Sequence, residues 1–372
     1  MRPSLDLLDV RILTCLDEDG PRNVSVISRK LGVPYETVRK RLKRLVSRFF
    51  VRFPMSVYHT YIGLKKAFVF ADAVSGYEDT LYSCMKANDF WIYVGQYYGR
   101  CEGCYGIYTV PVDHLEQFGR FVHELGATHV VRNVRLLWST CLHSVNATQN
   151  WFDPDSHRWI LNWEAWMEEI PNEGTELPPT LVEPDEFPIK ADDIDIVVLA
   201  KLEADYTRRM KDIAEILDMT PEAVGYHFKE HILKRGLIEK SQVFFRRFGE
   251  ATSDFYVFML RFQSEEKTAR FASSLLDKPF VYGLGKIIGE NGLIVHVCLP
   301  RREFRRFVRS LSELIKRGVL EAYEYLIEDY DKKQAQTISY EYFKDGAWIY
   351  NHTGHIENLT KIVEEAKGAG AF

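Results

Sequence analysis

Apolar residues along the chain follow first a helical period and then an alternating one. Between residues 6 and 48 they recur three or four positions apart, which predicts three short helices. Gly20 and Gly32 end the first two helices, and Pro34 stands at a first-turn position that proline favours. Three short helices with a tight turn before the last are typical of a helix-turn-helix, and the β-rich stretch after Phe50 predicts a wing.

From Lys66 onward the pattern changes to strands and helices in the order βαββαβ. This order predicts a ferredoxin-like sandwich. A tryptophan-bearing segment follows, which we expect to pack on an apolar edge of the sandwich or on the facing copy described next. The acidic, proline-containing stretch 171–191 then predicts an exposed linker.

The order of elements recurs after this linker. Asp9 and Leu13 of the first helix reappear 186 residues later as Asp195 and Leu199, and one inserted residue then aligns the third helices. We therefore predict an α+β chain in which a winged helix-turn-helix and a ferredoxin-like βαββαβ sandwich are duplicated in tandem. The predicted segments are winged helix-turn-helix 1 (1–62), αβ domain 1 (63–145), a tryptophan-rich tail (146–170), the linker (171–191), a charge-depleted winged helix-turn-helix 2 (192–250), αβ domain 2 (251–338) and an aromatic C-terminal tail (339–372).

Charge distinguishes the two predicted helix-turn-helix segments. The chain as a whole has a net charge of −5, but residues 29–52 hold nine basic residues and one acidic residue, a local net of +8. The corresponding stretch 215–239 has a net charge of −2. Because a helix with one charge sign on its outer face suits a phosphate backbone, the first segment is predicted to bind double-stranded DNA. The second segment keeps the apolar pattern without these cations, so we expect the cations of the first to be dispensable for folding.

A recognition helix placed in the major groove would present its first turns to the bases and its remaining cations to phosphates. The residues predicted to meet base edges are Tyr35, Glu36, Thr37 and Lys40. The residues predicted to contact phosphates are Arg39, Arg41, Lys43, Arg44 and Arg48, with Arg29 and Lys30 from the preceding helix.

Other candidate chemistry is sparse in the sequence. Cys101 and Cys104 form a lone CxxC pair that lacks further ligands nearby, and His227 and His231 lie four positions apart with no third ligand evident. We therefore predict no metal site and no cofactor. Glycine-containing hairpins that recur in both copies predict the walls of a pocket for a small-molecule effector, lined by Tyr97, Tyr98, Gly99, Lys286 and Gly289.

The first copy resembles the Lrp/AsnC, or feast/famine, family of transcription regulators, and especially its archaeal members. The resembling stretches are LDLLDVRIL in the first helix, YETVRKRLKRL in the third, and IGLKKAFVFADA leading into the sandwich. The resemblance implies DNA binding through the helix-turn-helix, self-association through the αβ domains, and effector binding between those domains. It predicts that two units in one chain form an intramolecular pseudo-dimer.

We therefore expect a sequence-specific transcription regulator without catalytic activity. The sequence has no apolar run of the ~18 residues that a membrane span needs and no signal peptide, so we expect it in the cytoplasm. Two alternatives stay open. One is a tetrapyrrole-binding enzyme that resembles sirohaem decarboxylases, and the other is an adaptor that recruits the basal transcription machinery through the second unit.

Overall fold

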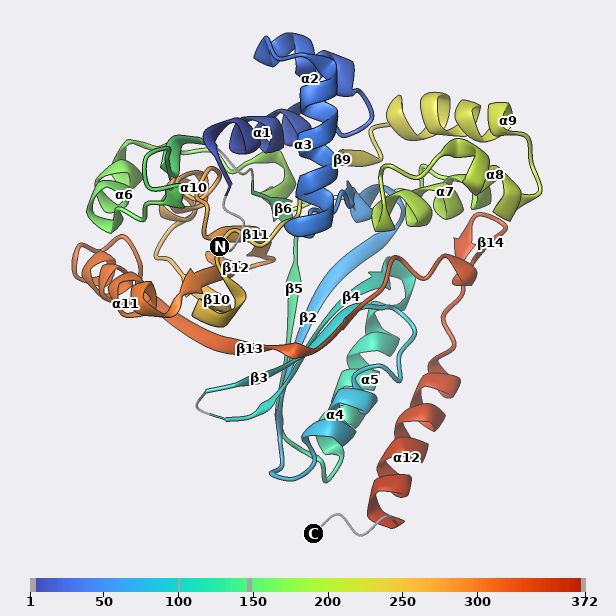
Figure 1. The fold of residues 1–372 in the computed structure, drawn as a ribbon. Coiled ribbons are helices and arrows are strands. Elements are labelled where there is room, and N and C mark those ends of the chain that lie inside the picture. Colours follow the sequence, from blue (N-terminus) through green and yellow to red (C-terminus); the bar gives the residue numbers. More distant parts are fainter. Residues whose placement is uncertain (1–4, 100, 146–148, 369–372) are drawn as a thin grey trace.

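The computed structural model describes residues 5–99, 101–145 and 149–368. Its elements form two similar halves, whose strands meet at the centre, with helical modules above the strands and a C-terminal helix along one side (Figure 1). Among the described residues, no helix is long and apolar enough to cross a membrane.

Each half contains a four-stranded antiparallel sheet with the strand order of a ferredoxin-like fold. In the first half the order is β3-β4-β2-β5, and in the second it is β11-β12-β10-β13. The first sheet consists of β2 (Leu64–Ala73), β3 (Trp91–Tyr98), β4 (Gly103–Pro111) and β5 (Val131–Ser139), with helices α4 (Glu78–Cys84) and α5 (Leu115–Ala127). The second consists of β10 (Ser253–Arg261), β11 (Val281–Ile287), β12 (Gly292–Pro300) and β13 (Ala322–Ala335), with α10 (Glu265–Ser273) and α11 (Arg301–Lys316).

The two sheets pair at both edges and so close into one eight-stranded barrel. Strand β13 pairs with β3, for example Ile327 with Tyr98, and β11 pairs with β5 through Ile287 and Ser139. Closure satisfies the backbone N–H and C=O groups of four edge strands that would otherwise remain open. Apolar side chains from both halves cluster together, among them Phe68, Phe70, Tyr105, Val257, Met259 and Ile294.

Two helical modules lie above the barrel (Figure 1). The first contains α1 (Leu7–Asp19), α2 (Val24–Leu31) and α3 (Tyr35–Arg48), and the second contains α7 (Asp193–Ala204), α8 (Met210–Leu217) and α9 (Pro221–Tyr226), which continues as a π-helical segment, His227–Leu233. The predicted wing of the first module takes a different form. Strand β1 (Met55–Val57) pairs with β9 (Ile238–Ser241) of the second module, so this strand joins the modules to each other.

The tail of each half packs against the sandwich of the other half. Helix α6 (Trp163–Glu169) buries Trp166 completely among Phe271, Phe280 and Phe307 of the second sandwich. Helix α12 (His352–Gly368) packs along α4 and α5 of the first sandwich. Trp159, in contrast, packs with the core of the first helical module. The facing copy is thus the packing partner of Trp163 and Trp166.

The segment 171–191 is attached to the protein surface and is not the free linker that the composition predicts. Leu181 is fully buried with the core of the second sandwich. The Glu183 carboxylate accepts hydrogen bonds from the Lys286 ammonium group and, at 3.1 Å, from the Gly289 amide. Apolar side chains scattered through the stretch supply these anchors, and average composition does not reveal them.

Candidate nucleic-acid interface

Helix α3 rests on the core of its module by a narrow apolar stripe. Val38 and Leu45 are fully buried, and they join a core cluster that includes Leu13, Leu16 and Ile27. The helix begins at Tyr35, so Pro34 is its N-cap residue and stands one position before the first-turn place that the sequence predicts for it. The first turns face outward, and Tyr35 is 47% exposed despite its large ring. The candidate base-reading end of the helix is therefore accessible.

The predicted phosphate-binding cations separate into an exposed set and a set engaged in ion pairs. Arg29, Lys40, Lys43 and Arg48 are exposed, and within the described residues they have no acidic partner. Arg39 is exposed and lies 3.5 Å from Glu36 on the same helix. Lys30 contacts Glu18 at 2.6 Å and Asp19 at 3.1 Å on the neighbouring helix α1. Pairs this exposed contribute little to stability and compete weakly with phosphate.

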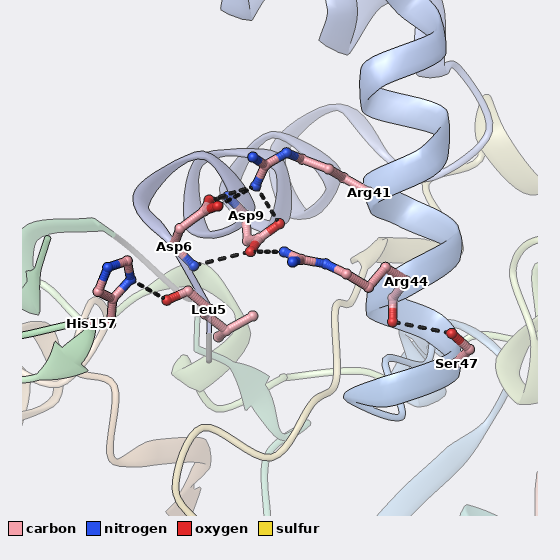
Figure 2. Close-up of polar contacts among 7 residues, drawn as sticks. All are labelled: Leu5, Asp6, Asp9, Arg41, Arg44, Ser47 and His157. Atoms are coloured by element: carbon pink, nitrogen blue, oxygen red, sulfur yellow. Dashed lines mark hydrogen bonds and ion pairs between the residues drawn. The ribbon is translucent and has the colours of Figure 1, made fainter. Parts of the chain in front are cut away.

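Arg41 and Arg44 point inward to the start of α1 (Figure 2). Asp6 and Asp9 form a capping box there, in which each carboxylate accepts the backbone N–H of the other residue, at 2.9 and 3.0 Å. Arg41 Nη1 donates to Asp6 at 2.6 Å and to Asp9 at 3.0 Å, and Arg44 Nη2 donates to the second Asp9 oxygen.

The Asp9 carboxylate is fully buried, so these guanidinium groups neutralise a charge that has no access to water. At Asp6, partial burial acts to raise the pKa, but the hydrogen bond from Arg41, the hydrogen bond from the Asp9 amide and the charges of Arg41 and Arg44 together outweigh it, and the pKa is lowered. Contrary to the expectation that the cations of α3 are dispensable for folding, Arg41 and Arg44 are partners of this buried carboxylate, so we predict that the fold needs them. Their place in the ion-pair network depends on residues more than thirty positions away, which a helical wheel does not contain.

The second module has the same capping box with different partners. Asp192 and Asp195 bond each other's amides at 3.1 and 2.9 Å. His227 and His231 lie beside these carboxylates, with Nδ1 atoms 2.8 and 3.2 Å from Asp195 oxygens. The spacing of the two histidines in the sequence indicated no third ligand, whereas the structure places two aspartates beside them. The feature of the sequence that could have indicated these aspartates is the aspartate pair that recurs at the start of each module.

The predicted effector pocket does not assemble from the five residues assigned to it. Tyr97, Tyr98 and Gly99 lie at the end of β3, on the seam with β13, whereas Lys286 and Gly289 lie on the β11 hairpin, which adjoins β5. Strands β4, β2 and β5 separate the two hairpins around the barrel. Strands β3 and β11 are equivalent edge strands of the two sheets, and they lie at opposite seams of the barrel. The two hairpins therefore lie at different seams because they are equivalent.

A cavity of about 1020 Å³ opens between the first helical module, the tail of the first half and the second sandwich. Six arginines line it, namely Arg158, Arg246, Arg247, Arg301, Arg302 and Arg306. Four of them are already in ion pairs, for example Arg301 with Asp254 at 2.9 Å and Arg306 with Glu303 at 3.1 Å, and the Arg247 guanidinium donates to backbone carbonyl groups. The sequence gives no sign of this cavity because its lining comes from distant segments.

Comparison with known proteins identifies the first helical module and provides a whole-chain fold relative. The model of the AsnC-type helix-turn-helix domain matches residues 5–46. An uncharacterised HTH-type transcriptional regulator of Pyrococcus furiosus is 52% identical over 48 residues, and one of Pyrococcus horikoshii is 48% identical over 48 residues. These matches cover 13% of this chain and only about a third of each relative, 32% and 30%.

The crystal structure of the siroheme decarboxylase NirDL is similar over 96% of this chain and 99% of its own, with a TM-score of 0.54 and 10% identity. Its complex with an iron-uroporphyrin III analogue gives a TM-score of 0.53 and 12% identity. The expectation that the chain has no catalytic activity is corrected here, because its whole-length fold is shared with an enzyme. The module that contains α3 has a similarity that does not depend on that fold: residues 5–46 match the model of the AsnC-type helix-turn-helix domain.

Proposed function

We propose that the protein is a sequence-specific transcription regulator that binds double-stranded DNA through α3. The observation that carries this proposal is the set of exposed cations on and beside this helix, Arg29, Lys40, Lys43 and Arg48. These side chains lie outside the Asp9 network, so folding does not account for them. The AsnC-type domain over residues 5–46 supports the same function.

The arrangement of the halves supports a tandem duplication that forms an intramolecular pseudo-dimer. Both sheets have the same strand order, their edges pair reciprocally, and their tails are exchanged. The second module replaces the cations of the first with a net negative charge, so we propose that it contacts DNA weakly. The DNA site should therefore be asymmetric, with one strong half-site.

A salt titration on random duplex DNA tests the role of α3. Each phosphate contact contributes about 0.9 to the slope of log affinity against log salt, or roughly a 3.5-fold loss of affinity per fourfold rise in salt. Lys43→Ala with Arg48→Ala should reduce the slope by about 1.8. A matched control removes two exposed cations of α11, Arg305→Ala with Arg309→Ala, and should leave the slope unchanged. Equal effects of the two variants would refute binding through α3.

A second candidate function rests on the arginine-lined cavity. The six lining arginines outnumber the acidic side chains that they contact, Glu250, Asp254 and Glu303, so the cavity of about 1020 Å³ keeps a positive charge that suits a ligand of that size with several carboxylates. The relative with the same whole-length fold is described in complex with an iron-uroporphyrin III analogue. On this basis we propose an anionic tetrapyrrole as the candidate ligand, and a decarboxylase as the candidate enzyme.

Titration of the purified chain with iron uroporphyrin, followed by the porphyrin absorption band, tests this second function. Binding should weaken at least tenfold when Arg158 and Arg302 are both replaced by alanine. Unaltered spectra on mixing would eliminate the candidate. The salt slope on DNA is an independent readout, so one function can fail without the other.

A further inference from the structure

Four potential metal ligands meet in the second helical module. Asp192 and Asp195 at the start of α7, together with His227 and His231 in the π-helical segment that follows α9, have ligand atoms that all lie within 4.8 Å of one another. Asp195 is fully buried, and the side chains of His227 and His231 are only 13% and 19% exposed. The group is thus a compact cluster with mixed nitrogen and oxygen donors, which rests on two adjoining helical segments.

The equivalent place in the first module is filled by arginines. The offset of 186 residues that relates Asp9 to Asp195 also relates Arg41 to His227, and the inserted residue brings Arg44 into register with His231. The inserted residue lies within the π-helical turn His227–Leu233. Single π-turns inside α-helices often occur at functional sites because they re-aim side chains. Here the turn accompanies the two histidines that face the aspartates.

This exchange changes what the pocket can bind. Guanidinium groups neutralise the aspartates but cannot coordinate a metal, whereas an imidazole nitrogen can donate a lone pair to one. In the second module, two carboxylates face two imidazoles, and one guanidinium, that of Arg235, lies 3.5 Å from Asp195. The Arg235 side chain is 40% exposed, so it has room to turn toward solvent. The pocket therefore has the charge to accept a divalent cation.

The four ligand atoms lie close enough together for one metal ion to reach them after small side-chain movements. Zinc holds nitrogen and oxygen ligands at about 2.0–2.2 Å, which places neighbouring ligands ~3.3–3.5 Å apart. If Asp192 binds through Oδ2, the Nδ1 atom of His231 lies 3.3 Å from that oxygen, which corresponds to such an edge. The four residues offer ligand atoms within 4.8 Å of one another, so the longer separations must shorten. The contact of His227 with Asp195 is shorter, 2.8 Å, and must lengthen slightly.

The capping box would orient the carboxylates for such a metal. Asp192 Oδ1 and Asp195 Oδ2 each accept a backbone N–H, which leaves Asp192 Oδ2 and Asp195 Oδ1 directed to the histidines. Outer hydrogen bonds of this kind fix the orientation of metal ligands. We propose that Asp192, Asp195, His227 and His231 form a binding site for a divalent transition metal of the zinc class. The bound metal ties α7 to α9, as Arg41 and Arg44 tie α3 to α1.

Zinc binding by the full chain, stripped of metal and kept reduced, tests the proposal. Competition with a chromophoric chelator gives the stoichiometry and the affinity. We expect the wild type to bind one zinc ion more than the variant His227→Arg with His231→Arg, which restores the arginine pair of the first module. Cobalt should give visible d–d bands without a thiolate charge-transfer band, which distinguishes this site from the six free cysteines.

Two further variants make the result specific. Replacing the exposed histidines His123 and His129 by arginine should leave zinc stoichiometry at the wild-type value. Asp192→Asn should weaken binding at least tenfold while circular dichroism stays unchanged. If the arginine variant fails to fold, His227→Gln with His231→Gln replaces it. Equal zinc binding by wild type and either double variant, or a pH-dependent stability without zinc binding, would overturn the proposal.

Discussion

The ion-pair network beneath α3 predicts a large and local effect of replacing Asp9. Its carboxylate is fully buried, caps α1 and contacts both Arg41 and Arg44. Asp9→Asn keeps the shape of the side chain and removes its charge. Breaking a buried ion pair costs about 3–5 kcal/mol, but the arginine side chains are 27% and 35% exposed, and water screens part of the loss. We therefore expect a destabilisation of about 2–3 kcal/mol, confined to the first module.

Hydrogen exchange measured by mass spectrometry is the suitable assay, because it reports local opening in a chain with several structural units. A cost of about 2–3 kcal/mol corresponds to exchange roughly 30- to 140-fold faster in α1 and α3 peptides. Peptides of the second sandwich should exchange as in the wild type. The control is Asp19→Asn at the other end of α1, where the partner Lys30 is 45% exposed.

That control should change exchange by less than about threefold, because exposed ion pairs contribute little. Equal exchange in the two variants would refute the reasoning. It would mean that Arg41 and Arg44 are not required for the fold and belong with the cations proposed to contact DNA.

Three other perturbations test separate features. Trp166→Ala removes a fully buried ring from the second sandwich and should cost about 3–5 kcal/mol in chemical denaturation, whereas Ile160→Ala, at a side chain 51% exposed, should cost well under 1 kcal/mol. Burial lowers the pKa of His296 to about 4 in the folded protein, below the ~6.5 of the unfolded chain. As the pH falls from ~6.5 to ~4, the unfolded chain therefore binds a proton that the folded protein does not bind, and stability decreases. His296→Gln should flatten this decrease, which denaturation midpoints measure. Glu183→Gln weakens the attachment of segment 171–191 to Lys286, so limited proteolysis should cleave this segment faster than in a Glu186→Gln control.

The sequence was sufficient to predict the local elements and insufficient to predict how the halves combine. Helical spacing predicted α1 to α3, and the βαββαβ order predicted the strand order of both sheets, because those patterns reflect neighbouring residues. The closed barrel, the pairing of β1 with β9 and the exchanged tails all depend on contacts between distant residues. Alternation shows which face of a strand is buried, but not which partner buries it.

The same distinction applies to the candidate site. The concentration of basic residues directed attention to α3, yet it could not separate Lys43, which is exposed, from Arg44, which contacts Asp9. These adjacent residues differ by about 100° around the helix, so one faces solvent and the other faces α1. His227 and His231 were recognised as a pair, but their aspartate partners lie at least 32 positions away along the chain.

Comparison of the two modules separates the cations of α3 that have a structural partner from those that have none. The loss of cations in the second module suggested that none were needed for folding in the first, but the buried aspartate is retained in both, as Asp9 and Asp195. Each aspartate needs a partner, supplied by Arg41 and Arg44 in one module and by His227 and His231 in the other. Only the cations without such a structural counterpart can be assigned to DNA. The charge of α3 thus divides into an inner part that holds the helix and an outer part that is free to bind phosphate.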